Sequence, residues 1–415
     1  MKDRIRTLVI HASGAPRWER QVVDTVSGRL GLGEVLRRAA ARVPARWQGN
    51  RYLRSLVSDG YGSLSYVLDW RAAFCQAPCL EVDLCNVNDR VEYGRKLRRM
   101  AEYPLVVVLH SAAGDNLESL RRATPYFQAR RGKLLLFVAN EYKLMPDKIG
   151  FARDVRADYI ASQLPAAAAQ WLYAECTASR ILLAPAALNE AVYHATGTER
   201  PIDVGFRGDL YGVALGDIDR TRALELFREK GPGWGLHTDI QYVRCPRSQW
   251  SEFLNRCKGI AGAESGTSYL ERDDRTQQAV ADFLRGRPGA TFDEVFDRFF
   301  RDYRSPVSGK AISSRHFEPI GTETCQVLVE GHYNGILVAD EHYIALARDL
   351  SNVADAVARF RDESYRAKTV RRAKEYALDA HTYRHRVDAL LRVILGDGVG
   401  LAPGIGRRAP GGVVT

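Results

Sequence analysis

The segment 313–329 contains residues whose types and spacing suit the recognition of a nucleotide. Glu318 lies in the first turns of a predicted helix, which leads into a short apolar strand at 325–329. Backbone amides at a helix start can face phosphate, and a carboxylate can accept hydrogen bonds from both hydroxyls of a ribose. Arg315 shares the helical face of Glu318, so it could hold phosphate or simply pair with that carboxylate. His316 could be no more than a satisfied packing residue.

Loops at the ends of predicted strands in the second half offer further ligand contacts. Arg207 and Gly208 follow the strand predicted at 202–206. At the carboxyl end of a parallel strand, Arg207 would face a cleft, where it could bind phosphate; a surface ion pair with Asp209 is the alternative. The loop after the next predicted strand is rich in small residues, which let backbone amides approach a ligand closely. These residues are Ser265, Gly266 and Thr267.

Polar residues also follow predicted strands of the first half. His110 ends a buried strand, where it could contact a ligand or serve as a capping or core histidine. Asn140 and Glu141 follow another strand, and Gly14 follows the first one. Because ligands of open α/β sheets bind beyond the carboxyl ends of the strands, these loops should line one cleft together with those of the second half.

The alternation of apolar runs and helical stretches predicts an α/β protein with parallel sheets. Strands are predicted at 8–12, 80–84, 105–109, 133–138, 159–161, 181–183, 202–206, 240–243, 259–262 and 325–329. Helices are predicted between them, including 32–43, 91–100, 117–128, 166–175, 219–230, 250–257 and 292–303. Two such halves imply two Rossmann-like domains that face one central cleft, with a hinge near 196–201.

The expected domains are two Rossmann-like domains at 1–198 and 201–375, a C-terminal helix at 376–400 and a disordered tail at 401–415. Two domains suit a chain of 415 residues. Neither half carries a dinucleotide fingerprint, because Gly31-x-Gly33 is followed by Leu36 where that motif needs glycine. A redox enzyme that uses NAD is therefore disfavoured.

Composition excludes several other classes. No run of about 18 apolar residues is present, which disfavours a transmembrane helix. The seven cysteines contain no C-x-x-C pair, so reduced thiols in the cytoplasm are expected and a metal site is not. The net charge of +10 is spread over scattered basic residues with no nucleic-acid-binding motif, which leaves anionic small molecules or an anionic membrane surface as partners. No P-loop, Ser-His-Asp order or H-E-x-x-H motif occurs.

The segment around Arg315-His-Phe-Glu318, running on to 352, resembles the donor-binding signature of GT-B glycosyltransferases. The resemblance is to the group 1, or family 4-like, class that includes spore-maturation-like sugar transferases. It implies transfer of a sugar, of hexosyl type, from a nucleotide sugar such as a UDP- or GDP-sugar, without a metal or other cofactor. It also implies that 1–198 is the acceptor-side domain, that 201–375 binds the nucleotide-sugar donor, and that the last helix, 376–400, crosses back to brace the N-terminal domain.

The resemblance assigns roles to particular residues. Glu318 would bind the ribose and Arg207 the phosphates, and His110 would contact the transferred sugar. Many retaining relatives carry two glutamates eight positions apart, but Lys310 stands eight before Glu318 here. Glu264 could be the displaced first glutamate, with 268–312 as an insertion, or an ordinary loop hydrogen-bonder. Retention of configuration is thus favoured but left open.

The acceptor would be a hydroxyl or amine of a growing polysaccharide, a lipid-linked sugar or a small natural product, and nucleic acid is not expected as a partner. Asn140 and Glu141 are candidates for acceptor contact. If the reaction inverts configuration, Asp115 and Glu141 are candidate bases. We expect a cytoplasmic protein, with peripheral contact at the inner membrane face as an option. The alternatives are a nucleotide-sugar epimerase on the same fold and a basic nucleic-acid-binding or scaffold protein.

Overall fold

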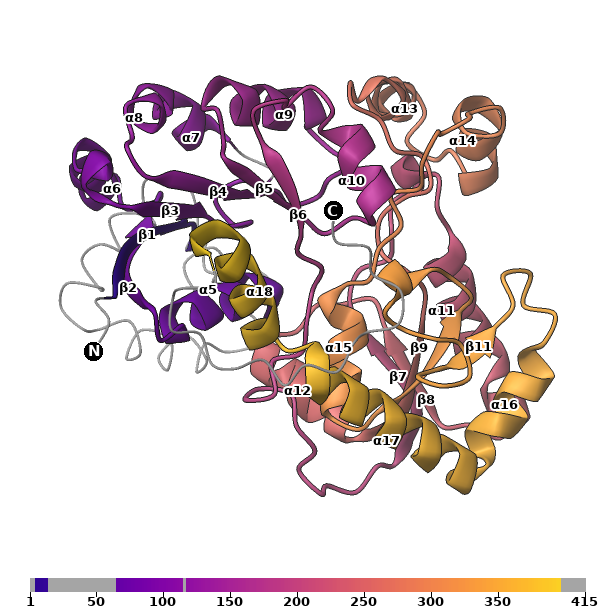
Figure 1. The fold of residues 1–415 in the computed structure, drawn as a ribbon. Helices are drawn as coiled ribbons and strands as arrows, with labels where there is room; N and C mark the ends of the chain where they lie inside the picture. The colour runs from indigo at the N-terminus through magenta and orange to yellow at the C-terminus, as the bar shows by residue number, and fades with distance from the viewer. Residues whose placement is uncertain (1–3, 14–64, 115–116, 397–415) are drawn as a thin grey trace, which may run out of the picture.

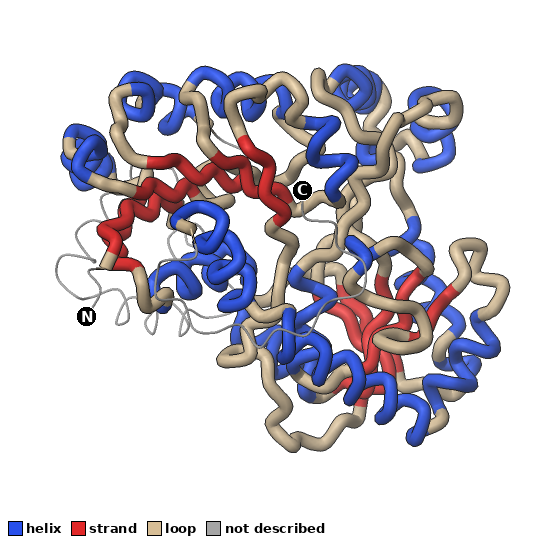
Figure 2. The backbone as a smooth tube through the Cα atoms, in the orientation of Figure 1, coloured by secondary structure: helices blue, strands red, loops and turns tan. Residues whose placement is uncertain are grey.

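The strands of the chain form two separate parallel sheets, seen in Figure 1 and, as red segments, in Figure 2. The computed structural model describes residues 4–13, 65–114 and 117–396. Within these residues the first sheet has six strands, in the order β2-β1-β3-β4-β5-β6, and the second has five, in the order β11-β10-β9-β7-β8. The strands are β1 (Ile5–His11), β2 (Leu80–Asn86), β3 (Leu105–Val108), β4 (Lys133–Phe137), β5 (Tyr159–Ser162), β6 (Arg180–Leu183), β7 (Ile202–Arg207), β8 (Thr238–Gln241), β9 (Cys257–Gly262), β10 (Cys325–Val329) and β11 (Ile344–Leu346).

Helices cover both faces of the first sheet, which explains its nearly continuous apolar strands. In β3, Val106 and Val108 join the core on one face, while Leu105 and Val107 join the core on the other. The helices over one face are α6 (Arg90–Arg98), α7 (Glu118–Arg122), α8 (Thr124–Gln128), α9 (Met145–Asp154) and α10 (Ala166–Leu172). Those over the other are α5 (Ser65–Gln76) and α18 (Tyr383–Leu395), as Figure 1 shows. This sheet and these helices are called the first lobe.

The second sheet is covered in the same way and, with its helices, forms the second lobe. Phe227 and Phe360 belong to the core on one face, and Trp250 and Phe317 to the core on the other. The helices are α11 (Asp219–Lys230) and α16 (Val353–Arg361) over the first of these faces, and α12 (Arg247–Asn255), α15 (Ser314–Gly321) and α17 (Glu363–Ala380) over the second. The expected pair of Rossmann-like domains is confirmed.

In the described residues, two segments connect the first lobe with the second. After β6 it passes into the second lobe, and after α17 it returns, so that α18 packs on the first sheet through residues such as Leu390 and Leu391. The two crossings are hydrogen-bonded to each other. The amide of Leu188 donates to the carbonyl of His381 (2.8 Å), and the amide of Tyr383 donates to the carbonyl of Leu188 (3.1 Å). The expected return of the C-terminal helix is confirmed.

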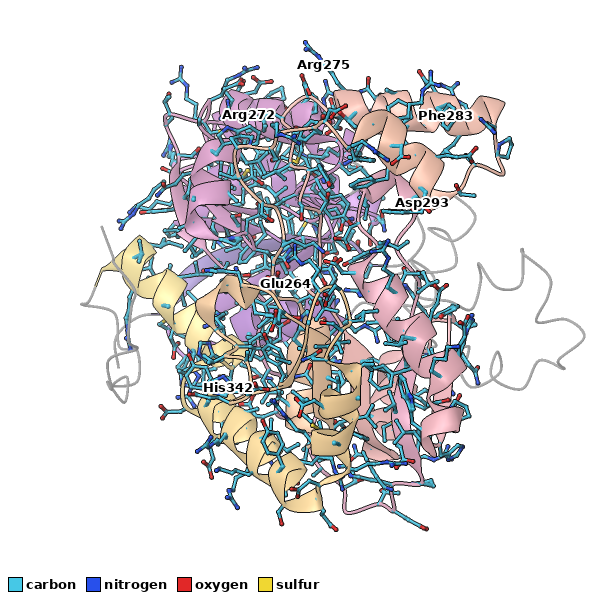
Figure 3. The ribbon with its side chains drawn as sticks, turned by 90° about the vertical axis from the view of Figure 1, so that its right-hand side faces the viewer. Glu264, Arg272, Arg275, Phe283, Asp293 and His342 are labelled. Carbon is cyan, nitrogen blue, oxygen red and sulfur yellow. The ribbon has the colours of Figure 1, made fainter. Side chains whose placement is uncertain are left out.

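A helical pair, α13 (Arg275–Gly286) and α14 (Phe292–Phe299), is inserted between β9 and α15. Its own small core contains Val280, Val295 and Phe300. The segment that leads into it contacts the first lobe, because the guanidinium of Arg272 lies 4.3 Å from the ring centre of Trp171 and also donates to the carbonyl of Trp171. Figure 3 shows Arg272 against the first lobe, with Phe283 and Asp293 on the inserted pair.

Some element bounds differ from expectation. The helix predicted at 117–128 is divided into α7 and α8, because Pro125 has no amide hydrogen to continue the first helix and begins a new one. Short 3-10 turns occupy Met100–Glu102, Val213–Leu215, Pro232–Trp234 and Tyr333–Gly335. In the described part of the chain, no helix has the length and apolar character needed to cross a membrane. The helix predicted at 32–43 and the tail at 401–415 lie outside the described residues.

Candidate active site between the lobes

A pocket lies between the two lobes and encloses about 1380 Å³ of empty space, its open mouth included. The first lobe contributes Ser65 and Tyr66 from the start of α5, together with loops that follow β4 and β5. The second lobe contributes loops that follow β7 and β9 and the start of α15. The pocket is therefore where ligands of parallel sheets are expected to bind, beyond the carboxyl ends of the strands.

The start of α15 forms one wall of this pocket. Ser313 precedes the helix, and its backbone amide donates to Nδ1 of His316 (2.9 Å). The other ring nitrogen, Nε2, lies 3.1 Å from the carbonyl oxygen of Ala263, so it carries the proton. Burial lowers the pKa of His316 to about 4, which keeps the ring neutral. His316 thus fixes the helix start, whose first-turn amides carry partial positive charge toward the pocket.

Glu318 lies one turn further along α15 and lines the same pocket. Its side chain is almost fully buried, and Oε2 accepts a hydrogen bond from Nε1 of Trp250 (2.7 Å). Nε of Arg315 lies 3.9 Å from the same oxygen. Desolvation lowers the pKa of the Arg315 guanidinium, and the charge of Glu318 opposes that effect. A buried carboxylate with a cation beside it is available for a polar ligand in the pocket.

Arg220 is a cation of the pocket lining that is not among the residues predicted from the sequence. It is the second residue of α11, and Nη2 donates to the hydroxyl of Tyr211 and to Oγ of Ser265, both at 3.0 Å. Its guanidinium carbon lies 4.2 Å from the ring centre of Tyr211. The Tyr211 hydroxyl also accepts from the amide of Gly266 (3.2 Å). Arg220, Tyr211, Ser265 and Gly266 all line the pocket.

The positively charged side chains of the pocket lie on one side of it. Its cationic lining residues in the described part of the chain, Arg220, Arg244 and Arg315, all belong to the second lobe. Together with the start of α15 they favour an anion on that side. Among the described residues, no three His, Cys, Asp or Glu side chains come together in a way that could hold a metal ion.

Comparisons with known proteins agree with this architecture. A family described as "Glycosyl transferase-like" matches residues 297–392, which include α15 and Glu318. An alpha-glucosyltransferase solved with UDP and a 13-mer DNA containing a HMU base is 9% identical, with 94% of this chain and 100% of that chain covered and a TM-score of 0.52. The chain has the GT-B fold.

Two further solved structures are similar to this GT-B chain. An alpha-glucosyltransferase in complex with UDP-glucose and DNA containing an abasic site is 10% identical, with 94% of this chain and 100% of that chain covered and a TM-score of 0.52. The HepE protein of Anabaena in complex with UDP-glucose is 9% identical, with 94% and 100% covered and a TM-score of 0.46. No curated protein sequence matches the chain.

The structure places Arg207 outside the lining of the GT-B pocket, contrary to its expected role at the phosphates. Its Nη2 donates to Oδ2 of Asp239 (2.6 Å), and its guanidinium carbon lies 3.9 Å from the ring centre of Phe253. The ion pair expected with Asp209 is not formed either, because Asp209 pairs with Arg244. The following residue, Gly208, does line the pocket.

Glu264 and Thr267 also turn away from the GT-B pocket. Oε1 of Glu264 accepts from the backbone amide of Tyr333 (2.6 Å), and a Cβ on Gly331 would lie only 2.4 Å from Oε2. Figure 3 shows Glu264 in the region between the two lobes. Thr267 is buried, and its hydroxyl donates to the carbonyl of Leu215 (2.7 Å). Glu264 therefore acts as a loop hydrogen-bonder, the plainer of its two expected roles.

His110 is a core residue of the first lobe and does not line the GT-B pocket. Its ring lies 4.9 Å from Phe137, 5.5 Å from Tyr66 and 6.0 Å from Trp70, measured between ring centres. Neither ring nitrogen has a hydrogen-bond partner among the described residues. Burial lowers the pKa of His110 to about 3. The expected contact with a transferred sugar is not supported by this placement.

Asn140 and Glu141 both line the GT-B pocket, from the loop after β4. The carboxylate of Glu141 already accepts three hydrogen bonds, from Oγ of Ser162 (2.6 Å), the amide of Gln163 (2.8 Å) and the hydroxyl of Tyr173 (2.8 Å). Burial raises the pKa of Glu141. A carboxylate held in this way organises the loop and is poorly placed to act as the expected base. Gly14 and Asp115 lie outside the described residues.

Proposed function

We propose that the chain is a glycosyltransferase that moves a sugar from a nucleotide sugar, such as a UDP- or GDP-sugar, to an acceptor hydroxyl or amine. One observation carries the proposal. The buried carboxylate of Glu318 and the start of α15 line the same pocket as Arg220, between two lobes with the GT-B fold. These groups match the ribose and the diphosphate of donors such as UDP- and GDP-sugars.

The diphosphate would lie against the second lobe. Arg220 and Arg315 offer guanidinium groups that can form paired hydrogen bonds with phosphate oxygens, and the first turn of α15 offers backbone amides. Negative charge grows on the diphosphate as the bond to the sugar breaks, so donors fixed in advance stabilise the transition state more than the ground state. With these cations in place, we propose transfer without a bound metal.

The ribose would lie beside Glu318. A carboxylate accepts hydrogen bonds but donates none, so it is matched to the hydroxyl groups of a pentose. Its burial strengthens such bonds, because the surroundings screen charge less than water does. The acidic neighbour does not repel the diphosphate strongly, since Arg315 lies 3.9 Å from Oε2 of Glu318 and balances its charge.

The acceptor would enter against the first lobe, where Tyr66, Asn140, Tyr142 and Gln163 line the pocket. The carboxylate of Glu141 is satisfied by three donors, so the described lining residues of this wall present no free carboxylate as a base. Asp115, the other candidate base, lies outside the described residues. We propose retention of configuration, in which a phosphate oxygen of the leaving group can take the acceptor proton. We propose a sugar, lipid-linked sugar or small natural product as the acceptor, and a hexose as the transferred sugar.

Thermal denaturation with UDP, GDP, UDP-glucose, GDP-mannose and a DNA oligomer tests the proposal. A ligand that binds only the folded protein raises its melting temperature. We expect a rise with at least one nucleotide or nucleotide sugar, and mass spectrometry should then detect a glycosylated product in a mixture of acceptors. No shift with any nucleotide would contradict the proposal. Conversion of one nucleotide sugar into an epimeric form, without any acceptor, would indicate an epimerase instead.

DNA belongs in this test as both ligand and acceptor. The two alpha-glucosyltransferase structures with a TM-score of 0.52 contain DNA, so the comparisons do not support the expectation that nucleic acid has no part. A shift with the oligomer alone would favour a binding or scaffold role. Glycosylated DNA among the products would identify the acceptor class and leave the proposed transfer intact.

A further inference from the structure

Trp250 makes a direct hydrogen bond to the carboxylate of Glu318. The indole Nε1 lies 2.7 Å from Oε2, and both residues are only 3% exposed. Trp250 belongs to α12 and Glu318 to α15, so the bond joins two helices on the same face of the second sheet. A buried indole N–H needs an acceptor, and here the acceptor is the carboxylate that faces the pocket.

Arg315 approaches the same oxygen. Its Nε lies 3.9 Å from Oε2, and its guanidinium carbon lies 4.4 Å from the ring centre of Trp250. Arg315 is held in turn by the carbonyl of Arg207, to which Nη1 donates (2.9 Å). Trp250 and Arg315 therefore converge on Oε2. No described residue donates a hydrogen bond to Oε1.

We propose that Trp250 is a positioning residue that makes the donor site selective for ribose over deoxyribose. The inference rests on the proposed function, in which Glu318 binds the ribose. By holding Oε2, the indole N–H fixes the carboxylate in one orientation and leaves Oε1 for a ribose hydroxyl. A missing hydroxyl would then leave Oε1 buried without a donor, which weakens binding much more than the loss of a solvent-exposed contact.

Trp250 also has a packing role that the experiment must separate from this one. It belongs to a core cluster of the second lobe, and its ring stacks on Phe253 with centres 5.8 Å apart. Trp250→Phe keeps an aromatic ring and removes the N–H donor. Phe253→Leu is the matched control, because it disturbs the same stack without touching the bond to Glu318.

The test measures dissociation constants of UDP, GDP and their 2′-deoxy and 3′-deoxy forms by isothermal titration calorimetry. We expect the wild type to prefer the ribose form of its nucleotide by about tenfold or more, as for a hydrogen bond to a charged group. In Trp250→Phe this ratio should fall about fivefold, mainly through weaker binding of the ribose form. In Phe253→Leu the ratio should stay at the wild-type value.

The outcomes separate the inference from the function on which it rests. A wild-type ratio retained in Trp250→Phe would overturn the role of Trp250 and leave the proposed function standing. If the wild type binds none of the nucleotides, the proposed function fails and the inference fails with it. Should Trp250→Phe fold poorly, Trp250→Leu serves instead, since it also lacks a side-chain hydrogen-bond donor. A double variant with Glu318→Gln should show no further loss of selectivity, because both changes remove the same interaction.

Discussion

Asp69 of the first lobe and Arg247 of the second form an ion pair in which the carboxylate is buried and the guanidinium is partly exposed. Nη2 of Arg247 contacts Oδ1 of Asp69, whose side chain is 1% exposed. Asp69 also accepts from Nδ2 of Asn189 (2.6 Å) and from Oγ of Ser65 (2.9 Å). Ser65 lines the pocket, and Arg247 lies one turn before Trp250 on α12. The pair thus ties the lobes together beside the candidate site.

Asp69→Asn should loosen this connection. Removing the carboxylate leaves the partly exposed Arg247 without its partner, at a cost between the ~1 kcal/mol of an exposed pair and the ~3 kcal/mol of a fully buried one. We expect a lower unfolding free energy and a higher KM for the donor, both measured on the purified variant. Asp147→Asn is the control, because Asp147 pairs with Arg121 on the surface, where such pairs contribute about 1 kcal/mol or less. If the unfolding free energy and the KM for the donor changed equally in the two variants, a special role for the interlobe pair would be contradicted.

Arg220→Ala should lower kcat strongly and lower the unfolding free energy only slightly. Loss of one fixed donor to developing charge typically lowers kcat by about 100-fold. Arg220→Lys should recover only part of the rate, since one ammonium nitrogen cannot hold Tyr211 and Ser265 and also offer the planar guanidinium fork to phosphate oxygens. Steady-state kinetics with the donor that shifts the melting temperature gives the measurement.

The control for Arg220 is Arg207→Ala. Arg207 pairs with Asp239 away from the pocket, so its removal should lower the unfolding free energy and leave kcat nearly unchanged. A large fall in kcat for Arg207→Ala, with Arg220→Ala unaffected, would restore the role that the sequence resemblance assigned to Arg207.

Glu318→Gln should weaken nucleotide binding by about tenfold, as expected for a lost hydrogen bond to a charged acceptor. The amide of glutamine keeps the shape of the side chain but carries no charge, and its nitrogen would face either Trp250 or the ribose. Calorimetric titration of UDP and GDP checks the effect. Unchanged affinity would remove Glu318 from the nucleotide site.

In His110→Phe, the unfolding free energy should fall less steeply as the pH is lowered. Burial lowers the pKa of His110 to about 3, whereas the unfolded chain titrates near 6.5. The unfolded state therefore binds more protons between these values, so the stability that His110 contributes is complete above pH 6.5 and is lost as the pH falls toward 3. One extra proton bound by the unfolded state lowers the unfolding free energy by about 1.4 kcal/mol for each pH unit of acidification.

Denaturant unfolding at pH 7.5, 6 and 5 measures this slope, and His110→Phe should reduce it. Phenylalanine fits the aromatic surroundings made by Tyr66, Trp70 and Phe137. We also expect the variant to keep most of its transferase activity, because His110 does not line the pocket. An inactive but stable variant would revive the predicted contact with the transferred sugar.

The sequence indicated the local features of the site better than the directions of its side chains. The start of α15 and the strand after it could be predicted, since helix capping and apolar runs are short-range signals. Arg207 and His110 were expected in the cleft because each follows or ends a strand. Their actual orientations depend on Asp239, Phe253 and an aromatic cluster that are distant in the sequence.

Arg220 was missed for a related reason. A basic residue in a helical stretch with several charges resembles an ordinary solvated side chain. The available signal was its position in the first turn of α11, where the helix dipole favours acids. A cation in that place after a strand-end loop indicates an anionic partner, and this reading requires no knowledge of the tertiary structure.

The two interlobe crossings, hydrogen-bonded at Leu188, His381 and Tyr383, determine how the pocket can open. Two covalent connections that meet at one place act as a single pivot. The lobes can rotate about an axis through that place once the contact of Arg272 with Trp171 is released, but they cannot separate there without breaking these backbone bonds. Substrate entry and product release should therefore change the distance between Tyr66 and Arg244 more than any distance near Leu188.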